Sequence, residues 1–343
     1  MGPFILDLHS FELDGEEREL LAHPTVGGVI FFSRNYHDKA QLAALITSIR
    51  EINPGLLLTV DHEGGRVQRF RQQFFPLPAP GRLAQHTGKD RLALLEDAGW
   101  LMAAELLALD IDLSFAPVLD LERGSEVIGD RSFGQDPEQV IAHTTAYIQG
   151  MRSAGMAAVA KHFPGHGSVR ADSHKESPVD CRDFDTIAKF DMAPFKTLIS
   201  QDLIQGIMPA HVIYETVDAN PAGFSEFWLK QVLRQQLGFN GLIFSDDLTM
   251  EGAAVVGSYA ERARSALQAG CDLLLACNHR KGAVEIIDAL PHNLHCDFSA
   301  LRAQAVARYL AQDPAKRVPK GSNLMQSAHW RAASERMQRF LDR

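Results

Sequence analysis

The chain has 343 residues, with 45% hydrophobic and 22% charged side chains, an ordinary composition for a soluble globular protein. A formal net charge of -9 argues against a protein built mainly to grip nucleic acid or an acidic membrane surface. The N-terminus lacks the basic and long apolar segments of a signal peptide, and no apolar run approaches the roughly 20 residues of a membrane span. The four cysteines form no CxxC pair, which favours a reducing compartment. We therefore expect a cytoplasmic protein.

Eight short apolar segments alternate with helical patterns along the chain. Continuous apolar strands of this kind suit a sheet that is covered on both faces. Their alternation with helices predicts a (β/α)8 TIM barrel of the α/β class, in one catalytic domain over residues 1–343. A doubly wound open sheet is the alternative, because periodicity alone does not show closure. The predicted strands span residues 4–9, 27–32, 56–61, 112–120, 156–163, 206–211, 241–247 and 271–277.

Helical patterns fill most gaps between these strands. The clearest helix follows Ser225, which can cap its first turn, and ends at Gly238. Its apolar residues recur every three or four positions and form one stripe. Residues 313–343 are predicted to form a polar connector and a final amphipathic helix outside the barrel. The other predicted helices span residues 37–52, 91–110 and 250–270.

Polar side chains end several of the predicted strands. The active sites of (β/α)8 barrels lie at the C-terminal ends of the strands. A strand that is buried for packing alone needs no polar ending, so this coincidence predicts an active site at that end of the barrel. The strand-end residues are Asp61, Asp120, Lys161, His162, His211, Asp246 and Asp247.

The segment VDHEGGRVQRF (60–70) places Asp61 at the end of the third strand and Arg69 shortly after a glycine turn. A carboxylate there can accept hydrogen bonds from two sugar hydroxyls, and the arginine can reach over the same pocket. A structural turn with an ion pair is an equally good interpretation. Arg131 lies in the loop IGDRSFG after the fourth strand, where it can clamp a substrate or lie on the surface.

Two adjacent acids, Asp246 and Asp247, end the seventh strand in FSDDLTMEG. Burying both carboxylates is costly, and side chains alternate along a strand, so only one should point toward the barrel axis. A partly desolvated carboxylate near arginine or lysine stays ionised and can attack an anomeric carbon. The alternative is that the pair caps a helix that begins near Met250.

The segment KHFPGHGSVRADSHKESP (161–178) is long for a connection between strand and helix and has few apolar residues, which is typical of functional loops. A zinc site of His162, His166 and His174 is one interpretation, although the spacing does not match HExxH. In an extended DSH segment, Asp172 can accept the Nδ1 proton of His174 and raise its pKa. That would produce a proton donor near neutral pH. A solvated polar loop is the alternative.

Together these motifs resemble glycoside hydrolase family 3, and specifically its single-domain bacterial β-N-acetylhexosaminidases. The matching segments lie between residues 61 and 250 in the order that the family has. Along the chain they are DHEGGRVQR, IGDRSFG, KHFPGHGSVRADSH, PAH and SDDLTM. His62 departs from the family pattern. The resemblance implies a barrel fold, a small amino-sugar substrate, and no metal or organic cofactor.

The resemblance also implies a role for each matched residue. Asp246 would be the nucleophile that forms a glycosyl-enzyme intermediate. His174 would be the general acid/base in a dyad with Asp172, whereas most retaining glycosidases use a second carboxylic acid. The implied sugar-binding residues are Asp61, Arg69, Arg131, Lys161 and His162.

The implied activity is that of an exo-acting retaining β-N-acetylglucosaminidase. It would remove terminal N-acetylglucosamine from 1,6-anhydro-N-acetylmuramic acid, with or without its peptide, in peptidoglycan recycling. A phosphorylase that uses phosphate, a sugar-binding barrel without catalysis, and Schiff-base chemistry through Lys161 are the alternatives. We expect a monomer whose partner is a small muropeptide or amino sugar, with no nucleic-acid or membrane partner.

Overall fold

The computed structural model describes residues 2–169, 178–290 and 317–343. Within these ranges, eight parallel strands form one sheet in the order β6–β3–β2–β1–β12–β11–β9–β7. Each of the eight predicted strand segments overlaps one of them, and β2 begins one residue before its predicted segment. The strands are β1 (Phe4–Asp7), β2 (Val26–Phe31), β3 (Leu57–Val60), β6 (Leu113–Ser114), β7 (Val159–Phe163), β9 (Gly206–Pro209), β11 (Leu242–Asp247) and β12 (Leu273–Ala276).

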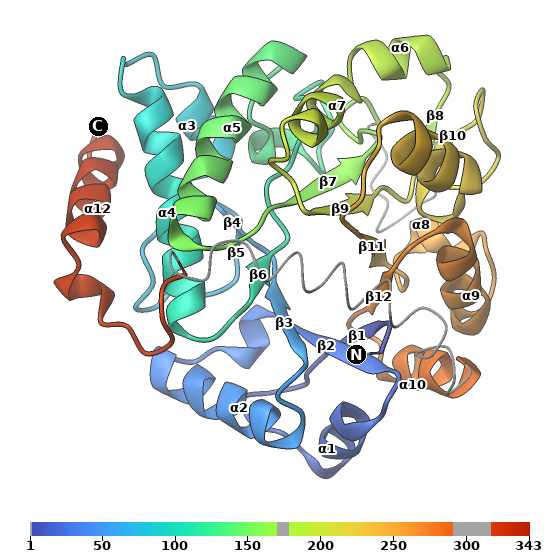
Figure 1. Cartoon of the computed structure of the whole chain (residues 1–343), viewed down its shortest axis with the longest axis horizontal. Helices are drawn as coiled ribbons and strands as arrows, with labels where there is room; N and C mark the ends of the chain where they lie inside the picture. Colours follow the sequence, from blue (N-terminus) through green and yellow to red (C-terminus); the bar gives the residue numbers. More distant parts are fainter. Residues whose placement is uncertain (1, 170–177, 291–316) are drawn as a thin grey trace.

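The two edges of this sheet meet. Lys161 in β7 pairs with Val118, which follows β6. The backbone N–H of Leu119 donates to the carbonyl oxygen of Lys161 at 2.7 Å, and that of Val159 donates to Ala116 at 2.9 Å. The sheet is therefore a nearly closed barrel (Figure 1). The predicted (β/α)8 fold is confirmed, and the open doubly wound sheet is wrong.

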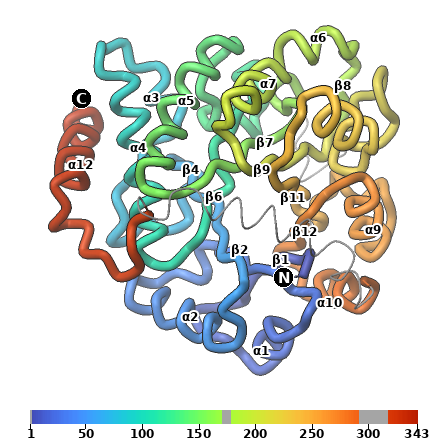
Figure 2. Tube along the Cα trace, in the orientation of Figure 1, coloured from blue at the N-terminus to red at the C-terminus, as the bar shows by residue number. Residues whose placement is uncertain are grey.

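Helices form a ring around the barrel, as both the ribbon and the tube views show (Figures 1 and 2). Two short strand pairs, β4 with β5 and β8 with β10, are added outside the main sheet. The strands of these pairs are β4 (His62–Gly64), β5 (Val67–Gln68), β8 (Val179–Asp180) and β10 (Ile213–Tyr214). The helices are α1 (Gly15–Ala22), α2 (Lys39–Ile52), α3 (Pro80–Ala84), α4 (Arg91–Ala108), α5 (Pro137–Ala154), α6 (Phe184–Lys189), α7 (Ala193–Ser200), an unlabelled helix Phe227–Gln236, α8 (Glu251–Ala254), α9 (Tyr259–Ala269), α10 (Arg280–Ala289) and α12 (Ala328–Leu341).

Apolar side chains fill two regions, as expected when each strand is buried on both faces. The larger cluster lies between the strands and the surrounding helices. The smaller cluster joins residues from most of the barrel strands and fills the barrel interior. Its members include Ile5, Ile30, Leu57, Leu113, Phe115, Val159, Met208, Leu242, Phe244 and Leu273. The barrel interior is thus filled by side chains and is not a pore.

Two helix predictions have different outcomes. The helix predicted after Ser225 is confirmed and spans Phe227–Gln236. The Oγ of Ser225 accepts a hydrogen bond from the backbone N–H of Trp228 at 3.1 Å. The single helix predicted over residues 250–270 is wrong. It is divided into α8 and α9 because Gly257 has a φ of +123° and Ser258 starts a new capping box with Glu261.

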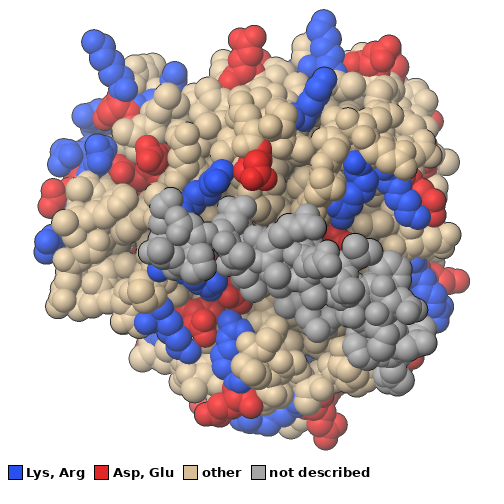
Figure 3. Space-filling model, viewed as in Figure 1, with Lys and Arg blue, Asp and Glu red and all other residues tan. Residues whose placement is uncertain are grey.

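The last helix, α12, lies outside the barrel and packs against α4 (Figure 1). Arg336 Nε donates to Asp97 Oδ2 at 2.6 Å, and the rings of Trp100 and His329 stack with centroids 4.0 Å apart. The predicted connector boundary at residue 313 lies outside the described residues. No helix in the described ranges is both long and apolar enough to cross a membrane. On the face drawn in Figure 3, the visible basic and acidic side chains are interspersed.

Candidate active site

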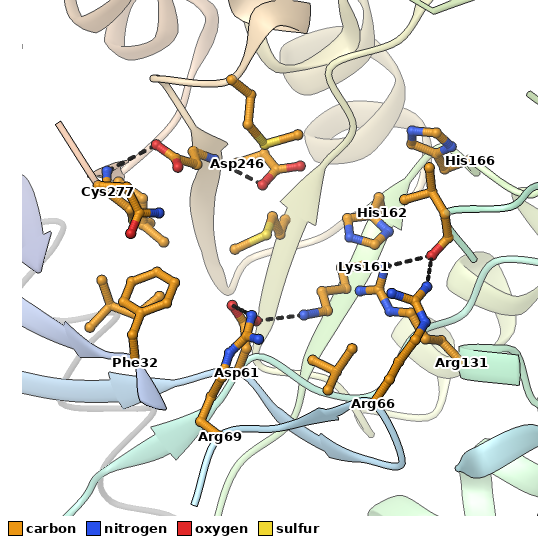
Figure 4. A pocket seen from close by; sticks show the side chains of 18 of the residues that line it. Phe32, Asp61, Arg66, Arg69, Arg131, Lys161, His162, His166, Asp246 and Cys277 are labelled. Atoms are coloured by element: carbon orange, nitrogen blue, oxygen red, sulfur yellow. Dashed lines mark hydrogen bonds and ion pairs between the residues drawn. The ribbon is translucent and has the colours of Figure 1, made fainter. Parts of the chain in front are cut away.

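A pocket of about 480 Å³ lies at the C-terminal ends of the strands, where the sequence predicts the active site. Acidic, basic and apolar side chains line it together (Figure 4). It brings together six of the eight predicted site residues. The other two, Asp172 and His174, lie outside the described residues. The six are Asp61, Arg69, Arg131, Lys161, His162 and Asp246.

Lys161 is the centre of a buried ion network. Its ammonium group lies 2.8 Å from Asp61 Oδ1 and 2.7 Å from Glu63 Oε1, and its side chain is 3% exposed. Arg131 donates from Nε and Nη2 to the two oxygens of Glu63, both at 2.8 Å. Among the described residues two of the three ammonium donors are therefore used, which leaves one for a ligand hydroxyl.

Glu63 was missed by the sequence reasoning, although it lies two residues after Asp61 in the same motif. Burial alone would raise the pKa of Glu63, but the charges and hydrogen bonds of Arg131 and Lys161 hold that pKa well below its usual range. Glu63 itself does not line the pocket. Its carboxylate instead holds Arg131 and Lys161 in place as a pair.

Asp61 and Arg69 are the more exposed members of the group. Arg69 Nη2 lies 3.7 Å from Asp61 Oδ2, and its guanidinium lies over the ring of Phe32 at 5.5 Å from the centroid. Asp61 comes directly after β3, and Arg69 directly after β5. These two residues can therefore contact the same ligand from one side of the pocket.

Asp120 positions the histidines of the pocket. Its buried carboxylate accepts hydrogen bonds from His162 Nδ1 at 2.6 Å and from the backbone N–H of His166 at 2.7 Å. Burial alone would raise the pKa of Asp120, but the interactions with His162 and then His166 outweigh burial and lower that pKa. Because Nδ1 of His162 faces this carboxylate, Nε2 is the ring atom left for a ligand. Asp120 was noted as a strand-end acid but was not included in the predicted site.

Asp246 and Asp247 end β11, and both line the pocket. The backbone N–H of Asp247 donates to Asp246 Oδ1 at 2.8 Å. Asp247 Oδ1 accepts from the N–H of Thr249 at 2.9 Å and of Cys277 at 3.0 Å. Both residues therefore lie at the pocket, and the statement that only one of the two acids faces the barrel axis stays a prediction. Met250, the residue before α8, makes no side-chain capping hydrogen bond.

The pH dependence of stability should report on Asp247. Burial raises the pKa of Asp247 from 3.8 to about 7, so the folded chain holds this proton more tightly than the unfolded chain does. The resulting stabilisation is complete below about pH 4 and is lost as pH rises through 7, by up to about 1.4 kcal/mol per pH unit. Asp247→Asn mimics the neutral carboxyl group and should flatten this dependence in urea unfolding. A variant with the parent's slope would contradict the assignment.

Two further histidines, His62 and His211, pack against aromatic rings away from the pocket. The buried ring of His62 packs against Phe70 and Phe74, with centroids 5.6 and 5.5 Å away, and burial lowers the pKa of His62 to about 3. His211 stacks on Phe224, and burial lowers its pKa too. Neither ring lines the pocket. The departure from the family pattern at His62 therefore lies away from the pocket.

The described residues give no support to a zinc site or to Schiff-base chemistry through Lys161. The described residues contain no group of three side chains able to hold a metal ion, and His174 of the hypothetical zinc site lies outside them. His162 and His166 line the pocket with ring centroids 6.0 Å apart. Nζ of Lys161 lies 2.8 Å and 2.7 Å from two carboxylates, so this side chain is engaged in the ion network. A Schiff-base lysine must instead attack a carbonyl carbon with a free amine.

The nearly closed parallel barrel carries its pocket of acidic and basic side chains at the C-terminal ends of the strands, where the active sites of barrel enzymes lie. Residues 5–308 match the glycosyl hydrolase family 3 N terminal domain. The chain therefore belongs to glycosyl hydrolase family 3.

Relatives with established names agree with this assignment. A protein of Tolumonas auensis named Beta-hexosaminidase is 57% identical over 344 residues, covering 100% of this chain and 99% of its own. A protein of the same name from Vibrio cholerae serotype O1 is 49% identical over 343 residues, with 100% and 99% coverage. The prediction of a glycoside hydrolase of the β-hexosaminidase class is confirmed.

Solved structures show the same fold. NagZ from Neisseria gonorrhoeae, in complex with N-trifluoroacetyl-D-glucosamine, superposes with a TM-score of 0.87 at 41% identity, covering 99% of this chain and 98% of that one. A family 3 β-N-acetylglucosaminidase from Paenibacillus superposes with a TM-score of 0.85 at 29% identity, covering 98% of this chain and 67% of the other.

Proposed function

We propose that the chain is an exo-acting retaining β-N-acetylglucosaminidase with Asp246 as its nucleophile. The observation that carries this proposal is the position of Asp246 across the barrel from Asp61. In the closed eight-strand ring, β11 and β3 are four strands apart in either direction. A hexosamine held by Asp61 and Lys161 would thus present its anomeric carbon to a carboxylate on the opposite strand (Figure 4).

The reaction would proceed in two displacements. An oxygen of Asp246 attacks the anomeric carbon while the bond to the leaving-group oxygen breaks, and His174 supplies the proton to that oxygen. Water then attacks the glycosyl ester while His174 takes up its proton, which releases N-acetylglucosamine and regenerates Asp246. Asp172 would orient His174. A neutral histidine avoids a second negative charge beside the nucleophile.

The remaining pocket residues would bind the sugar hydroxyls. Asp61 can accept two hydroxyl hydrogen bonds, while Lys161 can donate its last N–H. Arg131 and Arg69 would donate from two other sides, and Nε2 of His162 would meet a further hydroxyl. The pocket volume of about 480 Å³ lies within the range of small-ligand sites.

The substrate we propose is terminal N-acetylglucosamine linked to 1,6-anhydro-N-acetylmuramic acid, with or without its peptide. The reaction would take place in the cytoplasm during peptidoglycan recycling. The support is the family resemblance and the likeness to NagZ bound to an N-acylated glucosamine. We further propose that the enzyme acts as a monomer.

Trapping of the intermediate tests this function. A slow fluorinated N-acetylglucosaminide should label the enzyme, and peptide mass mapping should place the sugar on Asp246. A label on another residue would overturn the nucleophile assignment, and absence of a covalent adduct would argue against retention. Formation of a sugar 1-phosphate on addition of phosphate would identify a phosphorylase instead.

The variant His174→Ala should separate substrates by their leaving groups. An alkoxide needs a proton to depart, so kcat/KM for a disaccharide should fall by about 10²- to 10⁴-fold. An activated aryl glycoside leaves without that proton and should lose far less in kcat/KM. His37, whose ring is largely exposed, offers the matched control His37→Ala. Equal losses on both substrates would exclude proton donation by His174.

A further inference from the structure

The proposed nucleophile lies on an irregular strand end. Between the pairs Phe244–Leu273 and Asp247–Leu275, β11 advances by three residues and β12 by two, so β11 carries an extra residue there. This is the pattern of a β-bulge, which bends a strand, redirects its side chains and is frequent beside active sites. A bulge also interrupts the regular ladder of backbone hydrogen bonds. The position of Asp246, within the irregular part, therefore depends on the contacts that replace this ladder.

Side chains of β11 replace part of the ladder toward β12. Ser245 Oγ accepts a hydrogen bond from the backbone N–H of Leu275 at 2.9 Å. Asp247 Oδ1 accepts one from the backbone N–H of Cys277 at 3.0 Å. In a regular parallel sheet, backbone carbonyl oxygens accept such hydrogen bonds. The end of β11 is therefore fixed to β12 partly through side chains.

On the opposite side of β11, the ring of His211 forms a bridge from the end of β9. The paired residues of β11 and β9 extend to Ile243 and Ile207, and β11 continues from there to Asp247. His211 is the histidine of the PAH segment and follows β9 by two residues. Its Nε2 lies 3.1 Å from the backbone oxygen of Asp247. A side chain thus connects the two strands beyond their paired region.

The ring of His211 is the hydrogen-bond donor in this contact. A carbonyl oxygen can only accept, so the proton of the neutral ring is assigned to Nε2. Burial lowers the pKa of His211, which favours this neutral form. Nδ1 is then a buried acceptor, and it has no hydrogen-bond partner among the described residues. Because such an acceptor is costly, the stacking of the ring on Phe224 does not by itself account for a histidine here.

The backbone of Asp247 connects His211 to the nucleophile. Its carbonyl oxygen accepts from His211 Nε2, and its N–H donates to Asp246 Oδ1 at 2.8 Å. One residue carries both contacts, so a shift of its backbone would move the carboxylate of Asp246. The ring of His211 does not line the pocket, so it acts through Asp247 and not by contact with the sugar.

We propose that His211 is a positioning residue for the nucleophile: its Nε2–H holds the backbone of Asp247 and so fixes the direction in which Asp246 meets the anomeric carbon. This inference rests on the proposed glycosidase function. The proposed sugar-binding residues lie on other strands and loops. Loss of this hydrogen bond should therefore slow the chemical step and leave sugar binding unchanged. Misplacement of a reacting group by about 1 Å can cost about 10²-fold in rate.

The variants His211→Gln and His211→Asn form a matched pair that tests the proposal. Both lose the ring and its stacking on Phe224, but only the longer amide of glutamine reaches the position of Nε2. The slow fluorinated N-acetylglucosaminide reports on the first displacement alone. Its inactivation rate constant should fall about 10- to 100-fold in His211→Asn and less than about threefold in His211→Gln. Its binding constant should change less than about twofold in both variants.

His329→Asn is the control for loss of a stacked histidine ring. His329 lies in α12, outside the barrel, and stacks on Trp100, so this variant should change neither constant more than about twofold. Equal inactivation rates in the two His211 variants would overturn the inference, because both would then report only lost packing. A folded His211→Gln protein that is inactivated about tenfold more slowly would also overturn it. So would a binding constant that weakens as much as the rate falls, since that would indicate damage to the sugar pocket.

Crystal structures of the two variants separate this inference from the proposed function. The carboxylate of Asp246 should keep its position in His211→Gln and be displaced in His211→Asn. If the parent enzyme forms no covalent adduct, the proposed function fails, yet this comparison still decides the inference. An unmoved Asp246 in His211→Asn would overturn it.

Discussion

Replacing Asp246 by alanine should lower kcat by at least about 10⁴-fold, because the variant has no group to form the glycosyl ester. The fold should persist, since Asp246 lines an open pocket at the end of β11. Steady-state rates on an activated aryl N-acetylglucosaminide measure the loss, and thermal unfolding verifies the fold. This substrate needs little help from the acid, so the loss reports on the nucleophile alone.

A chemical rescue distinguishes loss of the nucleophile from general damage. Azide fits the space that the carboxylate leaves and attacks the anomeric carbon from the same face, so the expected product is an α-glycosyl azide. Asp247→Asn is the matched control on the same strand and should give no such product. Turnover by Asp246→Ala without azide would contradict the assignment, and so would a rescued product of β configuration.

The architecture was accessible to sequence reasoning because its signals are local. Each barrel strand is buried on both faces and is therefore a continuous apolar run. Closure of the sheet was not accessible, because it rests on backbone pairing between β7 and residues after β6. The split between α8 and α9 was readable in principle, since Gly257 and the Ser258–Glu261 capping box stand in the sequence.

The site was predicted in its composition but not in its internal support. Strand-end polar residues indicated the pocket that the structure forms from Asp61, Lys161 and Asp246. The support of these side chains comes from residues far away in sequence. Glu63 lies 68 positions before Arg131 in the sequence. The motif around Glu63 therefore does not show that Arg131 neutralises its carboxylate. The same holds for Asp120, 42 positions before His162.

Replacing Glu63 by alanine should lower the free energy of unfolding by about 3–5 kcal/mol, the range seen when one partner of a buried ion pair is removed. Arg131 and Lys161 would each lose the buried carboxylate with which they pair. KM should rise as well, because both cations would then be free to leave their positions in the pocket. Urea unfolding and steady-state kinetics measure the two effects.

Glu226 provides the matched control for this prediction. It forms an exposed pair with Lys230, with side chains 52% and 44% exposed, so Glu226→Ala should cost less than about 1 kcal/mol.

The pH dependence of stability gives a second test of the role of Glu63. Because the pKa of Glu63 is depressed, its stabilisation is present above about pH 4.5 and is lost as pH falls through the folded-state pKa. The stability difference between the parent and Glu63→Ala should therefore narrow in acid. A difference that is small at neutral pH or constant with pH would show that Glu63 does not hold the two cations.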